Sequence, residues 1–285
     1  NVNTLRRQEN ITRQQKIRLT KNHIQKITKT YVNNILTFAP GVTIGPKNES
    51  ELSDQKAAEL NNSVWSFIKE KENLKSLNRQ LAHDYIEMGE AAVKIFFDPQ
   101  GGTFKGYEPV YDEMGQPTFD ENGEPQADPV FHGAVKFERI LAFNLLRDPS
   151  AKAWADSRYV CYRKMVPLRD LKRQFKGDDD KLKMVTESSD KTYQVFDGAS
   201  GSYKDSDGLV MVREYYFRPN GEFPDGYYYI TTENGILFEG VLPLGVFPIV
   251  YVGFDEFGTS CRAYSIIKQL RPYQAEVNRS ASKIA

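Results

Sequence analysis

His83 and Glu87 have the spacing that comes nearest to a metal site in this sequence of 285 residues. Residues four apart lie on one face of a helix, so an imidazole and a carboxylate at these positions could approach a single ion. No second pair of ligands follows them, and the sequence has only three histidines. We therefore interpret the pair as part of a hydrated helix face and predict no metal site.

Other patterns that carry chemistry are absent from the sequence. The acidic runs DDD at 178–180 and DSDG at 205–208 lack the spaced oxygen ligands and the terminal bidentate glutamate of an EF-hand loop. There is no GxxxxGK[ST] phosphate loop, no GxSxG elbow and no GxGxxG motif after a strand. We therefore expect a protein that is not an enzyme, has no catalytic residues and uses no cofactor.

The composition, 40% apolar and 27% charged, is typical of a globular protein. No stretch approaches the roughly 20 apolar residues of a membrane span, so we expect no membrane partner. Cys161 and Cys261 lie far apart in the sequence without further ligands nearby. We predict two buried or half-buried thiols and a reducing compartment, not a disulfide or a zinc site.

The net charge is zero, but the first 37 residues carry eight lysines or arginines against one acid, Glu9. A basic arm of this kind can contact phosphate or an acidic neighbour, and it can also be a solvated helix face. The candidate contact residues in the arm are Arg6, Arg7, Arg13, Lys16, Arg18 and Lys21.

Apolar spacing predicts three helices in the N-terminal part of the chain. The first covers 14–38 and ends at PGVTIGP. The second has an apolar stripe made of Ala57, Leu60, Val64, Phe67 and Ile68. The third runs from Leu74 to a glycine, Gly89.

Strand patterns dominate the remainder. AAVKIFFDP and VFHGAVKFERI each alternate as a strand does, and an acidic β excursion with the turns DEMGQP and DENGEP covers 107–130. PLRDLKRQF predicts a short helix, and 177–208 has the composition of a loop or linker. LVMVREYYFRP, GYYYITTENGILFEG and FPIVYVGF predict an antiparallel meander over 209–262.

The terminal segment, 263–285, predicts a helix with an apolar stripe from Ile266 to Ile284, and Pro272 is expected in its first turn. Gln274, Asn278 and Ser282, each four residues apart, form a slowly winding polar ridge beside that stripe. Such a ridge can hydrogen-bond a neighbouring helix or a neighbouring subunit.

The fold class expected from all these elements is α+β. The chain is expected to be divided into the regions 1–38, 39–176, 177–208, 209–262 and 263–285.

Several stretches, in this order, resemble the portal proteins of tailed bacteriophages, most closely those of short-tailed phages. They are NHIQKITKTYVNNI with PGVTIGP, DYIEMGEAAVKIFFDP, FERILAFNLLRDPSA, DSRYVCYRKMVPLRDLKRQF, VREYYFRP, FPIV and LRPYQAEVNRSAS. The family's last helix in this region is similar, with Gln, Asn and Ser four residues apart, matched here by Gln274, Asn278 and Ser282. The loop 177–208 and Pro272 depart from the pattern.

The resemblance implies the N-terminal wing portion of a portal subunit. It would have long amphipathic N-terminal helices, a meander that belongs to the wing or the clip, and a final helix that leads to the stem or the long wing helix beyond residue 285. Such a protein forms a ring, as a dodecamer, around double-stranded DNA at the capsid vertex of the virion, after assembly in the host cytoplasm.

The partners that the resemblance implies are further copies of the chain, the major capsid protein, the terminase, which is a separate ATPase, and tail adaptor or ejection proteins. The basic arm would touch DNA, capsid protein or an adjacent subunit, and its residues do not rank these three. The alternative from a different class is a non-catalytic protein that binds carbohydrate or single-stranded nucleic acid on the tyrosine-rich sheet, around Tyr227–Tyr229. A protein interface explains exposed tyrosines equally well.

Overall fold

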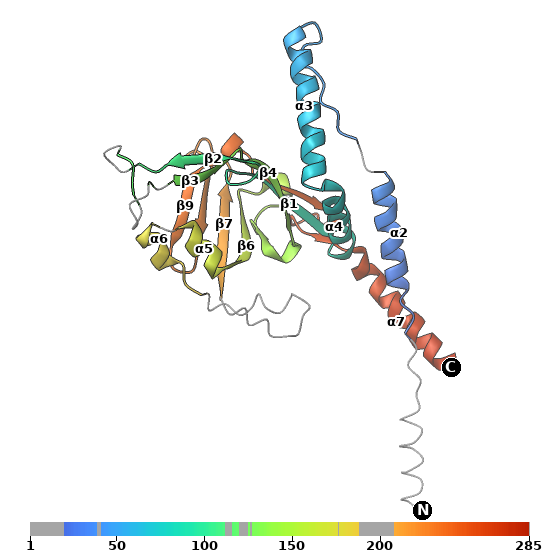
Figure 1. The fold of residues 1–285 in the computed structure, drawn as a ribbon. Coiled ribbons are helices and arrows are strands. Elements are labelled where there is room, and N and C mark those ends of the chain that lie inside the picture. The colour runs from blue at the N-terminus through green and yellow to red at the C-terminus, as the bar shows by residue number, and fades with distance from the viewer. Residues whose placement is uncertain are drawn as a thin grey trace, which may run out of the picture.

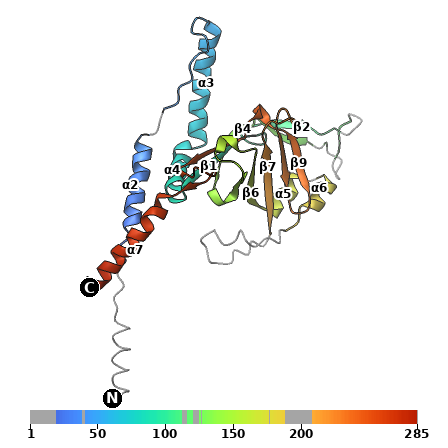
Figure 2. The same ribbon diagram turned by 180° about the vertical axis from the view of Figure 1, so that it is seen from behind.

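The computed structural model describes residues 20–38, 41–111, 116–119, 125, 127–175, 177–187 and 208–284. Within them the chain has the predicted mixed α+β fold with antiparallel sheets (Figure 1). The four longer helices gather on one side and the sheets on the other, and Figure 2 shows the same division from behind. The helices are α2 (His23–Thr37), α3 (Leu52–Lys71), α4 (Leu74–Glu87), α5 (Leu168–Gln174), α6 (Asp179–Met184) and α7 (Ile266–Ile284).

Helix α2 begins later than the predicted helix over 14–38. Residues 20–22 are not helical, and Asn22 caps the helix by accepting a hydrogen bond from the Gln25 N–H at 2.9 Å. Val32 then packs with Ala82 and Ile86 of α4 in a small helical core. The prediction was wrong at 20–22, where the Asn22 cap and the bonds from α7 to Lys21 and His23 set the start of α2, and its residues 14–19 lie outside the described part of the chain.

Helix α3 packs on its own chain through a face other than its apolar stripe. Ala58 is buried, and the Asn62 amide exchanges two hydrogen bonds with the backbone of Ile44, at 2.7 and 2.9 Å. Leu60, Val64 and Phe67 lie on the opposite side and stay exposed. The predicted apolar stripe is therefore helical, as expected, but faces solvent.

Three antiparallel strands, β1 (Glu90–Asp98), β4 (Ala134–Ile140) and β10 (Ile249–Gly253), form one sheet in the order β10–β1–β4. The turn from α4 into β1 requires Gly89, whose φ is +82° and whose missing side chain leaves room for the backbone of Tyr264. Strand β10 contradicts the predicted meander over 209–262, because it leaves that meander and pairs with β1. It does so because Ile249 and Tyr251 are buried in the core between the sheets.

The second sheet has five antiparallel strands in sequence order. They are β5 (Leu145–Arg147), β6 (Tyr159–Pro167), β7 (Leu209–Phe217), β8 (Tyr227–Thr231) and β9 (Ile236–Val241). Since β6 pairs with β7 along nine residues, from Tyr159↔Phe217 to Pro167↔Leu209, the predicted divisions 39–176 and 209–262 are not separate structural units. The inner faces of the two sheets share a core of buried residues that includes Ile140, Val160 and Leu242.

Shorter elements complete the described chain. β2 (Phe104–Pro109) and β3 (Ala127–Phe131) pair as the hairpin of the predicted acidic excursion, most of whose tip lies outside the described residues. The expected strand VFHGAVKFERI is divided into β3 and β4 at Gly133, where φ is +74°. The remaining pair is β11 (Asp255–Glu256) with β12 (Ala263–Tyr264).

The first part of the predicted linker 177–208 is helical, and its residues 188–207 lie outside the description. Asp178 caps α6 by accepting from the Lys181 N–H at 3.1 Å. Val185 is buried with Leu171 and Phe175 of the adjoining α5 segment. The prediction was wrong here because acidic residues suggested a loop, whereas they provide the cap and first turn of a helix.

Helix α7 contains Pro272 in its interior, not in its first turn as predicted. The helix begins at Ile266, after Ser265, whose carbonyl and hydroxyl oxygens accept from the Lys268 N–H at 3.1 and 3.4 Å. Pro272 has no N–H for the Lys268 carbonyl, but both residues are exposed, so water can replace that bond.

A buried carboxylate connects the two sheets. Glu214 of β7 lies 2.6 Å from Lys94 Nζ of β1 and 2.8 Å from Lys164 Nζ of β6, and the Tyr216 hydroxyl donates to it at 2.7 Å. Burial is the largest influence on the Glu214 pKa and raises it, but the two lysines together outweigh burial and hold the pKa below its ordinary value. Glu214 is therefore charged in the folded protein.

We expect Glu214→Gln to lower the free energy of unfolding by roughly 3–5 kcal/mol, because it leaves the buried Lys94 without its counter-ion and Lys164 with only the more distant Glu138 carboxylate, at 3.5 Å. Urea denaturation followed by circular dichroism measures this loss. The matched control is Glu276→Gln, which removes an exposed partner of Arg279 and should leave the denaturation midpoint unchanged. Equal midpoints for the two variants would contradict the structural role of Glu214.

Asp148, which follows β5 directly, makes the stability of the fold depend on pH. Its nearly fully buried carboxylate accepts from Arg158 Nε at 2.7 Å and from Ser150 Oγ at 2.6 Å, and these bonds hold its pKa well below the ordinary range. A carboxyl with a lowered pKa stabilises the fold above its unfolded pKa of about 4 and loses that effect as pH falls.

Asp148→Asn should therefore lower the melting temperature near neutral pH and flatten its decline below about pH 4. Melting temperatures measured between pH 7 and pH 2 test both effects. Asp180→Asn, at an exposed carboxylate, should follow the wild-type curve. A parallel decline for wild type and Asp148→Asn would show that the Asp148 contacts do not contribute.

Candidate interaction surfaces

The polar ridge of α7 holds the beginning of α2. Gln274 Oε1 accepts hydrogen bonds from the backbone N–H groups of His23 at 2.8 Å and Ile24 at 3.2 Å. Its Nε2 donates to the Lys21 carbonyl and, at 3.0 Å, to Asn278 Oδ1. Asn278 Oδ1 also accepts from the Lys21 N–H at 3.0 Å. These N–H groups lie at the helix start, where no backbone carbonyl of the helix can reach them.

The sequence left open whether this ridge binds a neighbouring helix or a neighbouring subunit. Gln274 and Asn278 bind a segment of their own chain, and α2 and α7 lie side by side in both views (Figures 1 and 2). The Ser282 hydroxyl donates to the Asn278 carbonyl at 2.8 Å within α7. The contacts of Gln274 and Asn278 are thus explained inside one chain, and a subunit contact of the ridge stays a prediction.

Of the six basic contact candidates, the structure describes Lys21 alone, and its side chain is exposed. Its backbone is bound to Gln274 and Asn278, which fixes the point where the arm meets the body of the protein. Arg6, Arg7, Arg13, Lys16 and Arg18 lie outside the described residues.

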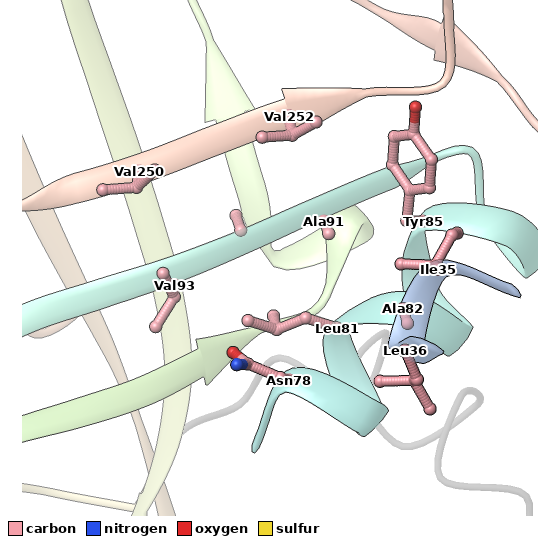
Figure 3. A pocket seen from close by; sticks show the side chains of 11 residues that line it. Ile35, Leu36, Asn78, Leu81, Ala82, Tyr85, Ala91, Val93, Val250 and Val252 are labelled. Carbon is pink, nitrogen blue, oxygen red and sulfur yellow. The ribbon is translucent and has the colours of Figure 1, made fainter. Parts of the chain in front are cut away.

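An apolar groove of about 470 Å³ lies between the helices and the outer face of the three-stranded sheet (Figure 3). Its helical wall includes Ile35 and Leu36 of α2 and Leu81 and Tyr85 of α4. Its floor is formed by the outward side chains of β1 and β10, namely Ala91, Val93, Val250 and Val252. Val250 and Val252 are 52% and 51% exposed, although valines on a sheet face are usually covered. Among the described residues that line it, the amide of Asn78 and the hydroxyl of Tyr85 are the polar side-chain groups.

A second unpartnered apolar surface is the outer stripe of α3, formed by Leu60, Val64 and Phe67, which are 64%, 46% and 62% exposed. Helix α3 projects away from the rest of the molecule in Figures 1 and 2. On α7, Tyr273 and Val277 of the predicted stripe are exposed as well. Exposed apolar surface gathered in this way is typical of protein interfaces.

The sequence pattern identified the outer-stripe residues as one face of a helix without indicating whether that face is buried, and it gave no sign of the groove. Trp65 was the available signal for the stripe, because it lies on the opposite side of α3 and is half-buried there. The groove depends on β10 pairing with β1, which the sequence pattern does not reveal.

The tyrosine-rich face predicted around Tyr227–Tyr229 lies on the five-stranded sheet. Tyr227 and Tyr229 are half-buried on its outer face, whereas Tyr228 packs against the inner core. The outer rings stack on one another. The centroid of the Tyr229 ring lies 4.7 Å from that of Tyr215 and 5.6 Å from that of Phe217, with ring planes within 23° of parallel. Neighbouring rings therefore cover the flat surfaces on which a base or a sugar would stack.

The residues considered for chemistry are not assembled into a site in the described ranges. His83 Nδ1 lies 3.2 Å from Glu87 Oε1 on α4, and nowhere in those ranges do three His, Cys, Asp or Glu side chains gather closely enough for a metal. Cys161 and Cys261 are both buried free thiols, as predicted, and burial raises the pKa of each. Across the described helices, none has the length and apolar content of a membrane span.

Gln274→Ala removes the hydrogen bonds that α7 gives to the start of α2. We expect faster amide hydrogen exchange at His23 and Ile24 and a loss of about 1–2 kcal/mol in the free energy of unfolding. Hydrogen-exchange mass spectrometry of the first helical peptide measures the opening. Gln269→Ala on the same helix removes one exposed bond, to Asp255, and should leave exchange at α2 unchanged. Equal exchange in both variants would contradict this role of Gln274.

Comparison with known proteins does not assign the chain to a family. No family model matches the sequence, and no curated protein matches it either. The resemblance to portal proteins therefore rests on the order of the sequence stretches that carry it.

Proposed function

We propose that this chain is the N-terminal wing portion of a phage portal subunit, which assembles into a dodecameric ring at the capsid vertex. The observation that carries the proposal is the amount of apolar surface left open on the helical side, in the groove, on the outer stripe of α3 and at Tyr273 and Val277 of α7. Surfaces of this kind in a folded chain favour assembly, and copies of one chain assemble with closed symmetry.

The two main apolar surfaces differ in shape, which favours a ring over a two-fold dimer. One is a helix that projects and the other is a concave groove. A two-fold interface brings identical patches together, whereas a ring joins two different patches in head-to-tail order. The fold thus offers the kind of surface pair that a cyclic assembly needs.

In this role the protein makes and breaks no bonds. Double-stranded DNA would pass through the ring during packaging and ejection, driven by a separate terminase. A neutral net charge suits a channel that must not hold the duplex, because each phosphate neutralised by a lysine or arginine adds affinity. The other proposed partners are the major capsid protein and the tail adaptor or ejection proteins, and the proposed locations are the virion and, during assembly, the host cytoplasm.

The alternative function, binding of carbohydrate or single-stranded nucleic acid on the tyrosine-rich sheet, has less support. It needs open ring surfaces, and the outer rings of β7 and β8 stack against each other. The same stacked rings, with hydroxyl groups such as that of Tyr227 at the edge, suit a role in sheet stability.

Electron microscopy of the full-length protein tests the ring directly. We expect rings of about a dozen subunits around a central hole, because one subunit leaves its apolar surfaces open. Mass photometry across a range of concentrations gives the independent subunit count. A protein that stays monomeric at every concentration would contradict the proposal.

A further inference from the structure

Helix α3 has two opposite faces, and the described residues cover only one of them. Ala58, Asn62 and Trp65 face the chain itself, through the Ile44 hydrogen bonds and the half-buried indole. The outer stripe, Leu60, Val64 and Phe67, lies about 180° away around the helix axis. This apolar face is left uncovered by the described residues and is open to a partner.

The apolar groove has the dimensions of this stripe. Leu60 and Phe67 are seven residues apart, which is about 10 Å along a helix. The α4 wall of the groove, from Asn78 to Tyr85, also spans seven residues and about 10 Å. Figure 3 shows the side chains of α2, α4, β1 and β10 that surround this space. A helix with three apolar side chains spaced by four and three residues is a suitable occupant for such a groove.

Charge favours the same pairing. Lys56 and Lys71 bound the outer stripe on the same side of α3, and Lys71 Nζ lies 5.4 Å above the Phe67 ring. Beyond the Val252 end of the groove, β10 is followed by one exposed carboxylate, Asp255, which accepts from Gln269 Nε2 of α7 at 3.0 Å, whereas Glu256 lies against Gly253 on the opposite face of the sheet. A lysine at the Phe67 end of the stripe can thus approach Asp255 when the apolar side chains enter the groove.

We propose that the outer stripe of α3 in one copy docks into the apolar groove of a second copy, with Leu60, Val64 and Phe67 as anchors. This inference rests on the ring-forming function proposed above and names the contact that would build the ring. A second copy is the occupant because one such contact, repeated around the ring, covers both open surfaces of every subunit. A contact between two α3 helices would leave every groove open.

Cysteine cross-linking of the full-length protein tests the pairing. Val64→Cys and Val252→Cys variants are prepared separately, mixed, allowed to assemble and oxidised mildly. We expect a disulfide-linked dimer in the mixture at least about tenfold above either variant alone, because a cross-link needs its two sulfurs within bonding reach. The native Cys161 and Cys261 are buried and should not compete. Ser66→Cys, on another side of α3, mixed with Val252→Cys is the matched control and should give no product.

The outcomes separate the two proposals. Rings that form without the Val64–Val252 cross-link, or with Val64→Cys linked to itself, would overturn the docking inference. The proposal of a ring would then still stand. Absence of any assembly overturns both proposals.

A second variant, Phe67→Ser, should raise the concentration needed for half-maximal assembly by about tenfold or more. It should leave the melting temperature of the isolated subunit unchanged, since Phe67 is exposed there. An unchanged assembly concentration for Phe67→Ser would also overturn the docking inference.

Discussion

The carboxylate of Glu214 constrains the whole β part of the molecule. It lies between the two sheets, and a charge removed from water there is tolerated only while Lys94 and Lys164 remain beside it. Lys94 belongs to β1 and Lys164 to β6, so this one group fixes how the three-stranded sheet lies on the five-stranded sheet. The apolar core around Ile140 and Val160 can pack efficiently only in that arrangement.

Ion pairs also set the position of the helices relative to the sheets. Glu90, the first residue of β1, accepts from Arg147 of β5 at 2.8 Å and from the Ala263 N–H of β12 at 2.8 Å. Asp84 of α4 is paired with Arg139 of β4. These contacts hold α4 and the approach to α7 against the sheets, so they fix the helical wall of the groove relative to its floor.

Much of the local structure followed from the sequence, because local structure depends on nearby residues. Gly89 ended α4 as predicted, and the strand patterns identified β1, β7 and β8. The pairing of strands was harder to predict. Alternation of apolar residues shows which side of a strand is buried but not which strand lies beside it, so β10 was assigned to the wrong sheet.

The same distinction applies to the candidate surfaces. Gln274 and Asn278 were identified as hydrogen-bonding residues from their spacing, although the choice between a helix of the same chain and another subunit needed the structure. For α3, both faces carry apolar groups, and only the tertiary fold decides that Trp65 faces inward and Phe67 outward. The pairing of β10 with β1 joins residues near 250 to residues near 92, so the central strand gains its second neighbour only after about 160 intervening residues have been made. During synthesis on the ribosome, one edge of β1 would therefore stay unpaired, and its hydrophobic face incomplete, until β10 emerges.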